Sequence, residues 1–203
     1  MTSPAIARDP LADHMLSPDN AALIIIDFQP VQVGSIVTMN KRLLVKNVTA
    51  LARTAKLYGL PVVLSTVNVA TGRNMPTIQQ ITDVLPDVPP IDRTSINAWE
   101  DEDFVAAVKA TGRSKLIMVA LWTEVCLVFP ALDALREGYE VFAVVDAVAG
   151  TSEVAHQAGI DRLVQAGAVP VSWIQVACEL QRDWAREATV PGFADIVFAE
   201  VGH

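Results

Sequence analysis

The sequence predicts a single-domain α/β protein with three layers, α/β/α, around a six-stranded, mainly parallel sheet of the Rossmann-like type. Two observations predict this fold class. Short apolar runs of strand length alternate with longer segments of helical period along the 203 residues. Glycines also stand where helices should stop, shortly before the next strand: Gly59, Gly112, Gly138 and Gly167. Strands joined by helices pair in parallel and need helices on both faces of the sheet.

The predicted strands cover residues 22–27, 61–66, 90–92, 115–121, 140–146 and 168–172. The predicted helices cover residues 40–58, 77–85, 101–111, 124–137, 152–166 and 175–187. No repeat or linker divides the chain, so one domain is expected over residues 1–203. Residues 1–20 and 190–203 are interpreted as an N-terminal and a C-terminal arm, which in small α/β domains often pack on a neighbouring subunit.

The composition indicates which binding partners, oligomeric state and cellular compartment to expect. A net charge of −8 without clustered Lys and Arg argues against binding to nucleic acid or to anionic membranes. An apolar fraction of 52% is high for a soluble monomer and indicates buried subunit interfaces, hence a homo-oligomer. The first ten residues lack the layout of a secretory signal, and two cysteines do not make a disulfide framework, so a cytoplasmic protein is expected.

Three chemically active side chains fall at the carboxyl ends of predicted strands, where open parallel sheets bind ligands. Asp27 closes the first strand, Arg93 follows the third, and Cys126 follows the fourth. Cys126 is expected in the first turn of a helix, where unpaired backbone N–H groups should lower the pKa of its thiol. The sequence therefore predicts a nucleophile with a carboxylate and a fixed cation beside it.

Each residue would have a separate task. Asp27 could take the thiol proton and later return it to a leaving amine, provided that burial raises the pKa of its carboxyl group. Arg93 stays charged, so it could hold the carboxylate but could not carry protons. Cys178 lies in an apolar helical pattern and is interpreted as a packing residue.

Several motifs resemble the isochorismatase-like cysteine hydrolases, and in particular their YcaC-like branch. Asp27-Phe28-Gln29 and Thr123-Glu124-Val125-Cys126 each follow an aliphatic strand, as in that superfamily. The branch is indicated by Ile96-Asn97-Ala98-Trp99, Asp103-Phe104-Val105, Lys109-Ala110-Thr111-Gly112, Val176-Ala177-Cys178-Glu179-Leu180 and Arg182-Asp183-Trp184. These pieces span most of the chain.

The resemblance implies the isochorismatase-like hydrolase fold and a catalytic triad of aspartate, lysine and cysteine. The triad carries over to Asp27, Arg93 and Cys126, with arginine in place of the usual lysine, as also fits the YcaC-like branch. The resemblance further implies a non-proline cis peptide bond at Trp122–Thr123. Backbone N–H groups of Trp122, Thr123 and Val125 are then expected to hold an oxyanion.

The remaining expectations concern the pocket and its contents. Phe28, Asn97 and Trp99 are the candidates for lining a substrate pocket. Nicotinamidases of the same superfamily hold a metal with an aspartate and histidines, but the corresponding residues 65–70 contain neither, and the three histidines are widely separated. No metal and no cofactor are expected. The resemblance also implies an assembly larger than a dimer, with an octamer as one candidate.

The favoured function is hydrolysis of an amide-like carbon–nitrogen bond in a small molecule through a thioester on Cys126. Two alternatives stay open. One is a catalytically idle, oligomeric binding or scaffold protein with the same fold. The other is a thiol-based redox sensor, although no second cysteine stands near Cys126 in the sequence to form a disulfide with it.

Overall fold

Six parallel strands form one sheet in the order β3-β2-β1-β4-β5-β6 in the computed structural model, which describes residue 9 and residues 12–201. The strands are β1 (Ala21–Ile26), β2 (Val62–Val67), β3 (Ile91–Arg93), β4 (Lys115–Ala120), β5 (Glu140–Val144) and β6 (Val169–Val171). The strand order reverses between β1 and β4, which pair from Ala21↔Lys115 to Ile26↔Ala120. In sheets of this type the reversal opens a crevice at the carboxyl ends of the two strands.

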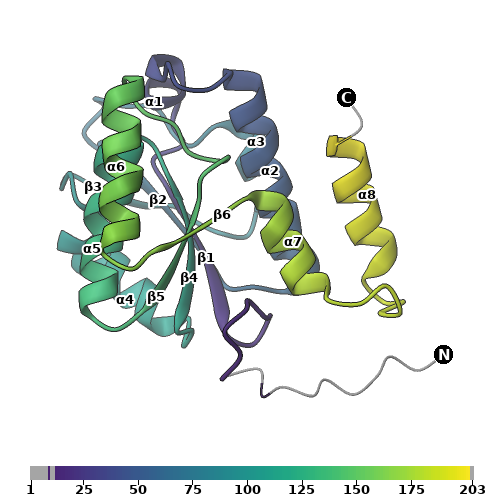
Figure 1. Ribbon diagram of the computed structural model, residues 1–203. Coiled ribbons are helices and arrows are strands. Elements are labelled where there is room, and N and C mark those ends of the chain that lie inside the picture. Colours follow the sequence, from purple (N-terminus) through teal and green to yellow (C-terminus); the bar gives the residue numbers. More distant parts are fainter. Residues whose placement is uncertain (1–8, 10–11, 202–203) are drawn as a thin grey trace.

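The two central strands are buried along their whole length, because helices cover both faces of the sheet. Their residues are nearly all aliphatic, as that burial requires. Figure 1 shows α4, α5 and α6 on one side of the sheet and α2, α7 and α8 on the other. The predicted three-layer α/β/α fold is confirmed, and the sheet is parallel throughout.

The helical elements follow the strands in regular alternation. They are α1 (Pro30–Ser35), α2 (Lys41–Tyr58), α3 (Gln79–Thr82), a 3₁₀ turn η1 (Ala98–Glu100), α4 (Glu102–Ala110), a π-helical turn η2 (Thr123–Leu127), α5 (Val128–Arg136), α6 (Glu153–Gln165), α7 (Trp173–Gln181) and α8 (Val190–Val201). In the described part of the chain, no helix is both long and apolar enough to span a membrane.

Helix α2 shows how the sequence sets an element's limits. The side chain of Asn40 accepts hydrogen bonds from the N–H groups of Arg42 and Leu43, which have no partner within the helix. At the other end Gly59 adopts a left-handed conformation with φ of 66°, which glycine tolerates without strain. Both signals are local, and the predicted and observed bounds agree to one residue.

Two helices were not predicted, and one predicted helix starts two residues earlier and ends six residues earlier than expected. Helix α1 has only six residues and α8 begins Val-Pro-Gly, which gives little helical signal. The helix predicted over residues 175–187 is Trp173–Gln181. The C-terminal arm is largely α8, whose Gly192 packs closely on Leu57 of α2 in the same chain. Of the N-terminal arm, residues 1–8 and 10–11 lie outside the described residues, while Leu16 is buried.

Candidate active site

Asp27, Arg93 and Cys126 meet at the carboxyl edge of the sheet. Asp27 directly follows β1, Arg93 is the last residue of β3, and Cys126 lies in η2 just after β4. Asp27 and Cys126 therefore stand on the two sides of the strand reversal, which is where a ligand site is expected. The fold brings together the three side chains that the sequence singled out.

Arg93 and Asp27 form a buried ion pair. Arg93 Nη2 donates to Asp27 Oδ2 over 2.7 Å, and neither side chain has any exposed surface. Strand β2 lies between β3 and β1, so the pair spans two strand spacings, about 10 Å. The long arginine side chain can cover that distance. Its Nη1 donates to the carbonyl of Ser95 over 2.9 Å, which fixes the guanidinium plane.

The carboxyl group of Asp27 has one oxygen occupied and one open. Burial raises the pKa of Asp27, while the charge and hydrogen bond of Arg93 act in the opposite direction. Oδ1 is buried and has no well-oriented donor within the described residues, and the Cys126 thiol is close enough to interact with this carboxyl group. Asp27 also adopts a left-handed backbone conformation with φ of 61°. The rise in the pKa of this carboxyl group is the condition on which Asp27 was expected to take and return a proton.

The thiol of Cys126 differs from the sequence-based expectation. Burial, together with the charge of Asp27 and its side-chain hydrogen bond, raises the pKa of Cys126 to about 12. The predicted lowering of this pKa by the helix N-terminus is therefore wrong, because the thiol is only 8% exposed and faces a carboxylate. Arg93 and the backbone N–H of Trp122 act the other way, but more weakly. At neutral pH the group is a thiol.

The backbone around Cys126 uses most of the donors that were expected to hold an oxyanion. The N–H of Thr123 donates to the carbonyl of Ala149, and that of Val125 donates to the carbonyl of Trp122. The N–H of Trp122, in contrast, is directed at the sulfur of Cys126. The cis peptide bond lies between Leu121 and Trp122, so the predicted position at Trp122–Thr123 was wrong by one bond.

The candidate pocket residues are not all near the triad. Phe28 is fully buried beside Asp27. Asn97 caps η1 and donates to Asp133 of α5, and the indole of Trp99 donates to Glu137 just after α5. Because α5 is about 13 Å long and starts close to Cys126, the structure does not bring Trp99 to the triad.

One residue that supports the site was not recognised as functional in the sequence. Gln29 is fully buried, and its amide donates to the carbonyls of Val67 and Met75 while accepting from the N–H of Val67. It thus ties the loop after β2 to the segment that carries Asp27. Its place two residues after Asp27 in the Asp27-Phe28-Gln29 motif was the available signal.

The side chains at this site do not form a set of metal ligands in the described part of the chain. Within the residues that the structure describes, no group of three or more His, Cys, Asp or Glu side chains is arranged to hold a metal ion. The polar groups at the triad instead pair with one another.

A parallel sheet with a buried Asp–Arg pair and a cysteine at its switch point fits the isochorismatase-like class of proteins. The profile of the isochorismatase domain family matches residues 21–175, and the chain belongs to this family. It is 42% identical over 173 residues to the probable hydrolase YcaC of Escherichia coli strain K12, covering 85% of this chain and 83% of that protein.

Two solved YcaC structures are similar to this one along nearly the whole chain. That from Pseudomonas aeruginosa has 37% identity and a TM-score of 0.88, with 93% of each chain covered. That from Escherichia coli has 39% identity and a TM-score of 0.88, covers 94% of this chain and 92% of that chain, and is described as an octameric hydrolase of unknown specificity. The expected membership of the YcaC-like branch is confirmed, and the chain is an isochorismatase-family hydrolase.

Proposed function

We propose that this protein is a cysteine-dependent hydrolase of small molecules with an amide-like carbon–nitrogen bond. The observation that carries the proposal is the contact between the Cys126 thiol and the buried Asp27–Arg93 pair. A thiol with a pKa of about 12 cannot act as a free thiolate at neutral pH. It needs a base in contact, and Asp27 is the group in that position.

The first half of the reaction forms a thioester. Asp27 accepts the thiol proton through Oδ1 while the sulfur of Cys126 bonds to the substrate carbonyl carbon. The carbonyl oxygen takes up the electron pair, and the N–H of Trp122, directed at the sulfur, is the donor we assign to this oxyanion. When the carbon–nitrogen bond breaks, Asp27 returns the proton to the departing nitrogen, which leaves as ammonia or an amine.

The second half consumes one water molecule. Asp27 accepts a proton from the water, whose oxygen bonds to the thioester carbon, and the carbon–sulfur bond breaks. The sulfur then regains the proton from Asp27, and a carboxylic acid leaves. Arg93 keeps its proton in every step and holds the Asp27 carboxyl group in place.

A relative supports the presence of a reactive nucleophile in this family. The Pseudomonas aeruginosa YcaC structure contains hexane-2,5-diol and covalent acrylamide. Acrylamide is a small, uncharged primary amide that bonds to nucleophiles. An uncharged substrate also suits the present site, because the guanidinium of Arg93 is buried and already paired with Asp27.

The alternatives fit the site less well. A redox-sensing cysteine is typically accessible and of low pKa. Cys126 is buried, and the pKa of its thiol is raised to about 12. A catalytically idle binding protein would keep the fold without turnover, so the assay below decides that case directly.

The assembly and the compartment belong to the same proposal. Trp184 and Phe198 stack with their ring centroids 6.4 Å apart, and more than 60% of each residue is exposed. Such a patch suits an interface between copies of the chain, and the Escherichia coli YcaC structure is octameric. Both cysteines are free, as suits the cytoplasm. The net charge of −8 disfavours nucleic acid as a partner.

The test is ammonia release from a panel of small amides and carbamoyl compounds. The wild-type protein should turn over at least one uncharged member, Cys126→Ala should turn over none, and Cys178→Ala is the matched control that keeps activity. Rapid quenching with the best substrate should trap an acyl group on the peptide that contains Cys126. Ammonia release that survives Cys126→Ala would refute the proposal, and no turnover of any member would favour the idle binding protein.

A further inference from the structure

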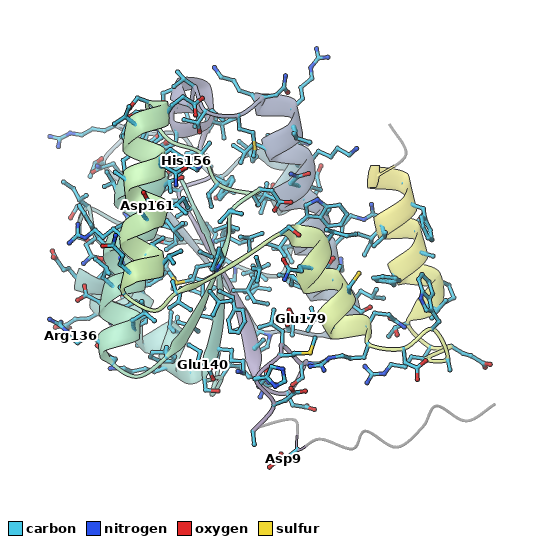
Figure 2. The ribbon with its side chains drawn as sticks, in the orientation of Figure 1. Asp9, Arg136, Glu140, His156, Asp161 and Glu179 are labelled. Carbon is cyan, nitrogen blue, oxygen red and sulfur yellow. The ribbon has the colours of Figure 1, made fainter. Side chains whose placement is uncertain are left out.

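The turn that carries Cys126 is tied at its first residue to helix α6. Thr123 Oγ1 lies 2.9 Å from Nδ1 of His156, in the first turn of α6. Figure 2 shows His156 near the end of α6 that lies at the carboxyl edge of the sheet, opposite the edge where Glu140 begins β5. The imidazole of His156 therefore reaches the turn η2, which carries Cys126, from helix α6.

The second residue of the turn is tied to the same segment. Glu124 Oε1 accepts hydrogen bonds from the backbone N–H of Thr151 at 2.9 Å and from its hydroxyl at 2.6 Å. Thr151 lies just before α6. Residues 149–156, which we call the backing segment, thus hold both Thr123 and Glu124, since Ala149 also accepts the N–H of Thr123.

Two glycines allow this close approach. A Cβ atom on Gly150 would lie 2.6 Å from Glu124 Oε2 and 2.8 Å from the Cβ of His156. A Cβ on Gly159, one turn after His156 in α6, would lie 3.1 Å from the Cα of Glu124. Helix α6 therefore packs through Gly159 directly on the backbone of the turn, while Gly150 lies against the side chain of Glu124 and against His156.

The turn needs this support because its own start has none. Trp122, which precedes it, provides no side-chain hydrogen bond to the first N–H groups, so no local cap holds them. The contacts from the backing segment take the place of a cap and leave the sulfur of Cys126 facing Asp27.

We propose that His156 is a positioning residue: through Thr123 it holds the π-helical turn in the one arrangement that puts the Cys126 thiol against Asp27. The expected effect on the catalytic rate rests on the proposed hydrolase function. The expected effect on the geometry of residues Thr123–Leu127 does not depend on that function. Burial lowers the pKa of His156, although Glu124 and Glu153 oppose this, so a neutral imidazole makes the contact at pH 7.

Three variants separate positioning from general damage. His156→Ala removes the contact with Thr123. His156→Asn places an amide close to the former Nδ1 and should restore the contact. Gln157→Ala is the matched control, because the exposed Gln157 is the next residue of α6 and its side chain bonds to Asp161 on the same helix.

Hydrogen exchange tests the proposal without any substrate. Loss of one hydrogen bond corresponds to about a threefold to tenfold faster exchange of the N–H groups of Thr123 and Val125. We expect that increase in His156→Ala, a return toward wild type in His156→Asn, and no change in Gln157→Ala. Unchanged exchange in His156→Ala would overturn the proposal whether or not the protein proves to be an amide hydrolase.

Turnover of the best amide from the panel gives the second readout. In His156→Ala the value of kcat should fall about tenfold or more while KM changes little, because the side chain acts through its contact with Thr123. His156→Asn should recover most of kcat. Wild-type kcat in His156→Ala, or equal loss in both His156 variants, would contradict positioning through Thr123 and leave the hydrolase proposal intact.

Discussion

Replacing Asp27 with asparagine should make Cys126 more reactive toward alkylating reagents and less active in hydrolysis. The substitution keeps the size of the side chain but removes its negative charge and its ability to take a proton. The charge of Asp27 is one of the causes that raise the pKa of Cys126, while Arg93, which remains, lowers it. The thiol should therefore ionise more readily in the variant, although hydrolysis should be lost.

The magnitudes follow from the burial of the pair. Two unit charges about 4 Å apart interact by about 4 kcal/mol at an effective dielectric constant of about 20. A single pKa unit corresponds to about 1.4 kcal/mol, so the thiolate fraction at pH 8 should rise at least about tenfold. Loss of a general base lowers turnover by about 10² to 10⁴.

The assay follows alkylation of Cys126 and Cys178 by iodoacetamide at pH 8, read by mass spectrometry of the two peptides. Cys178 is exposed, so its expected role in packing is wrong, and it serves as the internal control because no charged group contributes to its raised pKa. We expect faster labelling of Cys126 in Asp27→Asn, unchanged labelling of Cys178, and at least about 100-fold slower ammonia release. Slower or unchanged labelling of Cys126 would refute the assignment of Asp27 as the group that faces the thiol.

Three further predictions concern stability and assembly. Asp27→Asn leaves the buried Arg93 unpaired and should lower the free energy of unfolding, measured by urea titration, by about 3 to 5 kcal/mol. The double variant Asp27→Asn with Arg93→Met should recover most of this loss. If it does not, the unpaired charge is not the cause. Because folding raises the pKa of Cys126 from 9.0 to about 12, its thiol favours the unfolded state as pH rises above 9, by about 1.4 kcal/mol per unit. In Cys126→Ala the free energy of unfolding should decline less steeply with pH than in wild type. Tyr58, whose pKa is raised to about 12, contributes equally to both proteins, so its effect cancels in the comparison. Parallel curves of unfolding free energy against pH would contradict the burial of the thiol. Trp184→Glu should reduce the molar mass measured by light scattering, and an unchanged mass would exclude this patch as an interface.

The sequence was sufficient to predict the layers of the fold and the place of the triad. Strands such as β1 and β4 are continuous aliphatic runs, and their ends fix where Asp27 and Cys126 emerge. The nine-residue helix predicted over residues 77–85 is shorter, Gln79–Thr82, because Pro76 and Pro86 bound the segment closely and leave turns at both ends. Local pattern predicts where an element lies better than where it stops.

Features that depend on distant segments could not be predicted. The pKa of Cys126 is raised by burial and by the carboxylate of Asp27, which lies 99 residues earlier in the chain. The contact between Thr123 and His156 needs α6 to dock on the turn. Trp99 was a candidate for lining the pocket, but the chain returns toward the amino edge of the sheet before β4 begins, and the indole bonds to Glu137 there.

The left-handed backbone of Asp27 also bears on how this protein could be made more robust. An L-residue other than glycine in that conformation costs on the order of 1 kcal/mol, and a buried charge adds to the cost. Engineers who screen this chain for heat resistance alone should therefore recover glycine at position 27 together with an apolar residue at position 93. Such variants would be more stable but would lack the carboxylate and the cation of the proposed site. Any screen of this kind should therefore select for turnover at the same time.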